Sequence, residues 1–357
     1  MSSGPFRENG VHELISTALN EAGLDLYEMK DIASNPRLSS VREGAAIIEA
    51  KGIDVILAVG GGSAIDCAKV IGASGLSGVD PYEYLWGDRP DITASIPVVT
   101  VPTLAATGTE VNPYAVIVND DTKEKFYCET PHPVMAIMDP ELTVSVPLVL
   151  TIWGSMDILS HTFEFYFNGD TASEMQLCFS EAIIMSTMST INQLVANPKD
   201  VKARGELMWQ AVMAWGGLTK IGRSDPDMVC HGIEESFSGW FDTHHGACLG
   251  VLTPRWMDRV QLKKADGFAR FGRKVFGLSG DDDILVSLQA IASYKEWLKT
   301  IEAPMTFHDI GKRSFDEKDL QHVATTACRI YGGKLGRLVE FNESEVMELL
   351  KAGNVAY

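Results

Sequence analysis

Several features that would assign a class of protein at once are missing from this sequence. Its 357 residues contain no run of about 18 apolar residues, so no membrane-spanning helix is expected. The first ten residues, MSSGPFRENG, lack the apolar core of a signal peptide. Positive charge is scarce, because 30 Lys and Arg stand against 48 Asp and Glu, a net charge of −18. Nucleic acid and anionic membrane surfaces are therefore poor partners on electrostatic grounds.

Cysteine is also sparse and scattered. The six cysteines, at positions 67, 128, 178, 230, 248 and 328, form no CxxC pair. This distribution predicts reduced thiols in a cytoplasmic protein rather than a disulfide framework.

The length, hydrophobic content and periodicity of the chain are typical of a protein with two domains. The chain is long enough for two, and 45% of its residues are hydrophobic at a mean hydropathy of +0.02. Helical and strand patterns alternate up to about residue 145, and helical patterns dominate afterwards. The pattern predicts helices over 11–22, 39–51, 64–74, 151–168, 172–196, 202–221, 245–262 and 283–301. It predicts strands over 53–59, 95–101 and 134–138, and a hairpin of 114–118 with 125–128. The expected fold is α/β plus all-α, with a parallel-sheet nucleotide-binding domain (1–145) followed by an all-helical domain (146–357).

A glycine-rich turn joins the first strand to the next helix. Gly60-Gly61-Gly62-Ser63 allows close approach of a ligand, and the following helix offers free N–H groups to a phosphate. Ser63 is able to cap that helix and also to reach a phosphate. The turn matches neither the GxGxxG fingerprint nor a P-loop, so an ordinary tight turn stays open. Asp66 and Lys69, one turn further on, are expected to be solvated.

A second polar loop follows the next strand. Residues 103–110 read TLAATGTE, which is small and rich in hydroxyl groups. Because ligands of open α/β sheets bind at the carboxyl ends of the strands, this loop is a candidate for the same site. A surface turn is the alternative.

Histidines and carboxylates gather in two later segments. Asp157 and His161 lie four residues apart in an apolar helix, and therefore share a helical face. The second segment, HGIEESFSGWFDTHHG, holds His231, Glu235, His244 and His245. An Asp with several imidazoles suits Fe(II) or Zn(II). The alternative is a structural hydrogen bond on each helix, with histidines as caps.

These residues, in this order, resemble the iron-containing (group III) alcohol dehydrogenases. The carriers are VILAVGGGSAIDCAK, VPTLAATGTEVNPYAVIVND, MDPELT, MDILSH and HGIEESFSGWFDTHHGACLGVLTPRWM, and the resemblance runs from about Asn9 to the C-terminus. The similarity is strongest to the branch of NADPH-dependent butanol dehydrogenases and broad-range aldehyde reductases. It implies a nucleotide-binding α/β domain followed by an all-α metal-binding catalytic domain.

The resemblance also implies a set of site residues. The family's Asp and His four apart, then two His fourteen apart, fall on four metal ligands: Asp157, His161, His231 and His245. Its nucleotide-binding positions fall on Gly61, Gly62, Ser63, Asp66, Thr103, Thr107, Asn112 and Lys125. The implied reaction passes a hydride between NAD(P) and an alcohol or aldehyde held by the metal, Fe(II) or Zn(II). NADP(H) is slightly favoured over NAD(H), and a cytoplasmic homodimer is expected.

Two departures from the family pattern stand out. The family's first strand is missing, and the loop that approaches the adenosine ribose aligns with Ser2–Glu8, where Arg7 is a candidate for a 2′-phosphate. The second departure is Glu235, where the family usually has a histidine that assists proton transfer. Glu235 is a candidate general acid–base, with an extra metal ligand or a simple hydrogen-bonding role as alternatives.

Two other functions fit part of the pattern. Sugar-phosphate cyclases related to dehydroquinate synthase also combine a nicotinamide with a metal, but Asp157 and the apolar surroundings of its helix favour an uncharged substrate. A metal-binding homologue with impaired redox turnover is the other alternative.

Overall fold

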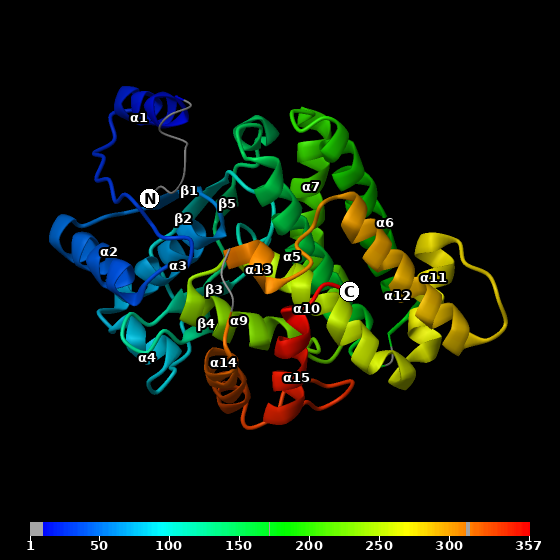
Figure 1. The fold of residues 1–357 in the computed structure, drawn as a ribbon. Helices are drawn as coiled ribbons and strands as arrows, with labels where there is room; N and C mark the ends of the chain where they lie inside the picture. The colour runs from blue at the N-terminus through cyan, green and yellow to red at the C-terminus, as the bar shows by residue number, and fades with distance from the viewer. Residues whose placement is uncertain (1–9, 171, 312–314) are drawn as a thin grey trace. The chain divides into compact units, whose positions relative to one another are not determined.

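The computed structural model describes residues 10–170, 172–311 and 315–357 (Figure 1). These residues separate into two compact units. Unit 1 comprises the chain up to Pro147 together with Lys199–Met208, and unit 2 comprises Leu148–Pro198 and Trp209–Tyr357. The expected loop around Arg7 lies outside the described residues.

Unit 1 is built on a parallel sheet. Strands β1 (Ile56–Gly60), β2 (Val98–Pro102) and β5 (Met135–Ala136) lie in the order β1-β2-β5, and all pairs are parallel. Strands β3 (Tyr114–Val118) and β4 (Lys125–Glu129) form a separate antiparallel pair. The predicted parallel sheet and the predicted hairpin are both confirmed. In Figure 1 the labels β1, β2 and β5 mark the neighbouring strands.

The helices of unit 1 cover this sheet. Helix α3 (Gly62–Ser77) packs against β1, β2 and β3 on one side and against α2 (Leu38–Lys51) on the other. Every residue from Ala64 to Ser74 is therefore buried. Such a helix must be apolar or small-sided all round, as this one largely is. The remaining helical elements are α1 (Val11–Glu21), α4 (Pro81–Leu85) and the 3₁₀ turn η2 (Pro140–Thr143).

The regular elements of unit 2 in its described residues are helices, apart from an isolated antiparallel bridge between Leu335 and Phe341, and this confirms the predicted fold class. Helix α5 (Leu148–Tyr166) packs against α6 (Glu174–Ala196) and α10 (His245–Val260), and α9 (Val229–Phe241) packs against α10 and α14 (Glu317–Ile330). The other elements are α8 (Gly217–Lys220), η3 (Gln261–Lys263), α11 (Ala265–Phe276), α12 (Asp283–Thr300), α13 (Phe307–Gly311) and α15 (Glu343–Gly353). In the described part of the chain, none of these helices is long and apolar enough to cross a bilayer.

One predicted helix is interrupted. The stretch 202–221 forms α7 (Val201–Ala214), shared by both units, and then α8, which starts at Gly217. The break falls at Gly216, whose backbone is extended, with φ −92° and ψ 176°. A Cβ there would lie 2.8 Å from the carbonyl oxygen of Val212. Glycine therefore permits a sharp exit from α7 that hydrophobic periodicity does not reveal.

Two helical glycines of unit 1 should respond oppositely to alanine. A Cβ at Gly72 would lie 2.9 Å from the backbone oxygen of Ile96, whereas at Gly205 it would meet Pro140 at an ordinary 3.5 Å. We expect Gly72→Ala to destabilise the protein by about 1–3 kcal/mol through overpacking. Gly205→Ala should stabilise it by about 0.5–1 kcal/mol, because alanine lowers the entropy cost of helix formation. Urea-unfolding midpoints measure both, and shifts of the same sign would contradict the packing described for α3.

Candidate metal centre and nucleotide-binding loops

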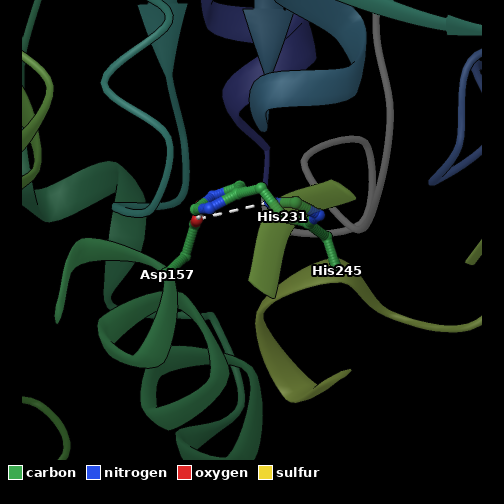
Figure 2. Close-up of side chains that lie close together, drawn as sticks. All are labelled: Asp157, His231 and His245. Carbon is green, nitrogen blue, oxygen red and sulfur yellow. Dashed lines mark ion pairs between the residues drawn. The ribbon is translucent and has the colours of Figure 1, made fainter. Parts of the chain in front are cut away.

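The candidate metal centre lies among three helices of unit 2. Asp157 and His161 come from α5, His231 from α9, and His245 is the first residue of α10. The Oδ1 atom of Asp157 lies 3.3 Å from Nε2 of His161, 3.6 Å from Nε2 of His231 and 3.3 Å from Nε2 of His245. Figure 2 shows Asp157, His231 and His245 gathered from their separate helices. One carboxylate oxygen is therefore faced by three imidazole nitrogens.

This donor set fits a divalent metal ion. Asp157, His231 and His245 offer ligand atoms that all lie within 4.8 Å of one another. The Asp157 side chain is only 1% exposed, yet neither of its oxygens has an aligned hydrogen bond from the described residues. Such a buried carboxylate is costly unless a cation compensates it. Carboxylate oxygen with imidazole nitrogen is a ligand set used for Fe(II) and Zn(II).

The electrostatics of the centre favour positive charge. Burial raises the pKa of Asp157, but its electrostatic and hydrogen-bonding interactions with the neighbouring imidazoles outweigh burial and hold that pKa well below its usual value. Burial lowers the pKa of His161 to about 3, so this ring is neutral, as a metal ligand must be. Burial also opposes a proton on His231, but the Glu164 carboxylate overcomes it and raises the His231 pKa well above normal. The carboxylates thus create the potential that a dication needs.

Two buried glutamates contact the ligand histidines and were missed by the sequence analysis. Glu164 lies 2.5 Å from Nδ1 of His231, and Glu234 makes a short contact with Nδ1 of His245. Each glutamate follows a histidine by three residues, in HTFE and in HGIE. That repeated spacing is the signal that could have pointed to them.

Glu235 and His244 also lie in this part of unit 2. Glu235 is buried on α9 and accepts a hydrogen bond of 2.8 Å from the Tyr331 hydroxyl. His244 precedes α10, and its ring packs on Trp153 with 4.9 Å between centroids. It is His245 that faces Asp157, in agreement with the fourteen-residue spacing.

In unit 1, the glycine turn lies at the carboxyl end of β1. Strand β1 ends at Gly60, and α3 begins at Gly62 with Gly61 as its N-cap. Ser63 does not cap α3, which has no side-chain cap. The Ser63 hydroxyl instead donates to the carbonyl oxygen of Ser34, a partner too distant in sequence to be anticipated. The first turn of α3 therefore has no side-chain acceptor for its N–H groups, and such groups at a helix N-terminus are suited to an anion.

The polar loop that follows β2, residues 103–110, is called the threonine loop below and lies against the glycine turn. The Thr103 amide donates to the Gly60 carbonyl over 3.0 Å, and a Cβ on Gly62 would lie 2.9 Å from the Thr107 hydroxyl oxygen. Only glycine lets these two loops approach so closely. Further along, Asn112 accepts from the Tyr114 amide, and Lys125 begins β4 as a buried residue.

Asp66 and Lys69 are buried rather than solvated, which corrects the sequence expectation. The Lys69 ammonium donates to the carbonyl oxygens of Thr109 and Asn112 over 3.1 Å each. The Asp66 carboxylate accepts from the Thr109 hydroxyl and from the Val116 amide. Burial raises the pKa of Asp66 and lowers that of Lys69. Because the charges lie on one helical face, 3.7 Å apart, they compensate each other while shaping the loop.

Fold and site together define a class of protein. A parallel-sheet unit carries a glycine turn and a hydroxyl-rich loop at its strand ends, and a helical unit carries an aspartate–histidine cluster that fits a metal ion. This combination is typical of a metal-dependent enzyme that uses a nucleotide cofactor.

Comparison with known proteins gives the family. Residues 1–140 match the family model of iron-containing alcohol dehydrogenases, and residues 151–353 match the C-terminal model of the same family. The chain is 33% identical over 355 residues to NADH-dependent butanol dehydrogenase A of Clostridium acetobutylicum, covering 98% of this chain and 89% of the relative. It is 28% identical over 315 residues to an NADPH-dependent aldehyde reductase of Escherichia coli, covering 86% and 80%.

A solved structure agrees. NADH-dependent butanol dehydrogenase A of Thermotoga maritima superposes with a TM-score of 0.93 at 32% identity, covering 99% of this chain and 90% of that one. The chain therefore belongs to the iron-containing alcohol dehydrogenase family, and is an oxidoreductase of the alcohol dehydrogenase and aldehyde reductase type with an Asp-His-His metal site.

Glu110, in the threonine loop, gives a pH-dependent prediction. Burial raises its pKa from 4.5 to about 7. Between these two pH values the folded protein therefore keeps a proton on Glu110 that the unfolded chain has already lost. Its contribution to stability should fall as the pH rises from about 4.5 to 7, and then level off. Glu110→Gln removes this loss, and its stability relative to wild type should rise over that range by up to about 3 kcal/mol. Urea unfolding from pH 5 to 8 measures the difference, and a pH-independent difference would contradict it.

Proposed function

We propose that this protein interconverts small aldehydes and alcohols with a nicotinamide nucleotide, using Asp157, His161, His231 and His245 as the ligands of Fe(II) or Zn(II). The observation that carries the proposal is the convergence of three Nε2 atoms on one buried carboxylate oxygen. Membership of the iron-containing alcohol dehydrogenase family supports it. The apolar, aromatic surroundings of α5 favour an uncharged substrate over a phosphorylated one.

The ion and the side chains around it have separate roles in the proposed reaction. When bound, the ion supplies Lewis acidity toward the oxygen of the aldehyde or alcohol. Asp157 supplies the charge of the ligand set and the histidines its neutral donors. Glu235, held by the Tyr331 hydroxyl, is the proposed acid–base that gives a proton to the alcohol oxygen or removes it.

The loops of unit 1 form the proposed nucleotide site. The N–H groups of Gly61, Gly62 and Ser63 at the start of α3 suit the negative charge of a pyrophosphate. Thr103, Thr107, Asn112 and Lys125 complete the proposed set. Asp66 belongs to it by holding Thr109 and Val116, because both carboxylate oxygens are engaged within the protein.

We propose NADH as the preferred donor, although the resemblance on its own favoured NADP(H). The support is that two butanol dehydrogenases at 32–33% identity are named NADH-dependent, whereas the relative named NADPH-dependent is 28% identical. Butanal and similar aliphatic aldehydes are the proposed substrates on the same grounds. The homodimer and the cytoplasmic location stay predictions.

The first test is a turnover assay of metal-loaded protein. We expect aldehyde-dependent oxidation of NADH that requires Fe(II) or Zn(II), with a higher kcat/KM than for NADPH. Asp157→Asn should abolish both metal binding and turnover, because the substituted amide has no charge to offer the cation. Metal and nucleotide binding without turnover on any aldehyde would favour the homologue with impaired redox activity instead.

The role of Glu235 is tested by its pH profile. Glu235→Gln keeps the hydrogen bond from Tyr331 but removes the exchangeable proton, so kcat should fall by about 10²–10⁴-fold and lose its dependence on this group. Glu235→His, which restores the residue usual in the family, should recover part of the rate with a shifted profile. An unchanged pH profile in Glu235→Gln would remove Glu235 from proton transfer.

A further inference from the structure

We propose that Glu164 and Glu234 are positioning residues that set the affinity of the metal centre by fixing the tautomer and orientation of His231 and His245. The inference rests on the proposed metal site and adds two residues to it. Neither glutamate is a ligand, because each contacts the Nδ1 side of a ring whose Nε2 faces Asp157.

Glu164 is held rigidly beside His231. Its Oε1 accepts from the backbone amides of Cys230 and His231, over 3.1 Å each. Its Oε2 lies 2.5 Å from Nδ1 of His231, and its side chain is only 1% exposed. The Oε2 atom accepts a hydrogen bond at this position and so keeps the ring proton on Nδ1. The lone pair of Nε2 is then left for a metal.

Glu234 does the same for His245 in a more exposed setting. The Glu234 side chain is fully buried, whereas the His245 side chain is 23% exposed. A ring at that edge of the site has the freedom to turn toward solvent unless its Nδ1 is held. The short contact from Nδ1 of His245 to Oε2 of Glu234 supplies that restraint.

His161 lacks such a partner. Its Nδ1 is buried without a hydrogen bond from the described residues. Packing holds the ring instead, because it stacks on His231 with 4.7 Å between centroids and contacts Trp215 in a tilted arrangement, also at 4.7 Å. Of the three histidines, His161 should therefore contribute least to metal affinity.

The connectivity runs from helix to helix. Glu164 of α5 restrains the ligand of α9, and Glu234 of α9 restrains the ligand of α10. Helices α5 and α9 thus each carry the carboxylate that orients the ligand on the next helix.

The test measures metal affinity directly. Dissociation constants for Zn(II) and Co(II) come from chelator competition on the full-length protein, for Glu164→Leu, Glu164→Gln, Glu234→Leu and Glu234→Gln. We expect each Leu variant to bind about 10–100-fold more weakly than wild type. The Gln variants should fall in between, because the amide oxygen still accepts from Nδ1–H.

A matched control is available in the same unit. Glu181 is a buried carboxylate that accepts a hydrogen bond from the Tyr166 hydroxyl and pairs with Arg270. Neither of these partners is a proposed metal ligand. Glu181→Gln should lower the melting temperature yet leave the metal dissociation constants unchanged. An equal loss of affinity in this control would mean that the effect is general destabilisation, and would overturn the proposal.

A measurement on wild-type protein keeps the test independent of folding defects. In the zinc-loaded protein with ¹⁵N-labelled histidine, ring correlations should show Nδ1–H on His231 and His245, with slow proton exchange at both. Rapid exchange or Nε2–H at either ring would overturn the assignment. Wild-type protein that binds no Zn(II) or Co(II) would instead refute the metal site itself, so the two failures are distinguishable.

Discussion

The burial of the Asp157 carboxylate is the constraint on which the helical unit depends. A carboxylate that is 1% exposed and lacks aligned hydrogen bonds needs positive charge beside it. Three helices bring imidazoles to one of its oxygens, and two glutamates on those helices contact Nδ1 of two of the rings. Close packing makes this possible, since a Cβ on Gly246 would lie 2.0 Å from the backbone oxygen of Trp153.

Unit 1 uses buried charge in a related way. Lys69 and Asp66 lie under the threonine loop and hold it through backbone carbonyls and amides rather than by meeting a ligand. The loop in turn lies against the glycine turn, where Gly62 leaves no room for a side chain. In both units, buried ionic groups contact the loop or the rings that form the proposed sites.

Periodicity and turn chemistry predicted most of the fold. The parallel strands are short apolar runs that end in glycine or in a polar loop, and the long helices have helical spacing, so both were legible. The helix over 202–221 was predicted as continuous because its apolar pattern runs through Gly216, where the backbone leaves the helix. Ser63 was a candidate cap because its local context suits one, whereas a residue 29 positions away takes its hydroxyl.

The sequence by itself determined the family, the order of the two units and the candidate ligands, because these depend on residue identity and on spacing within one helix. Four-residue spacing places Asp157 and His161 on one face, and the fourteen-residue interval implied by the family resemblance selects His245 over His244. Only the tertiary structure decided that Glu164 contacts His231 and that Glu234 contacts His245. Spacing along one helix says which side chains share a face, but the neighbour that the face meets depends on how the helices pack.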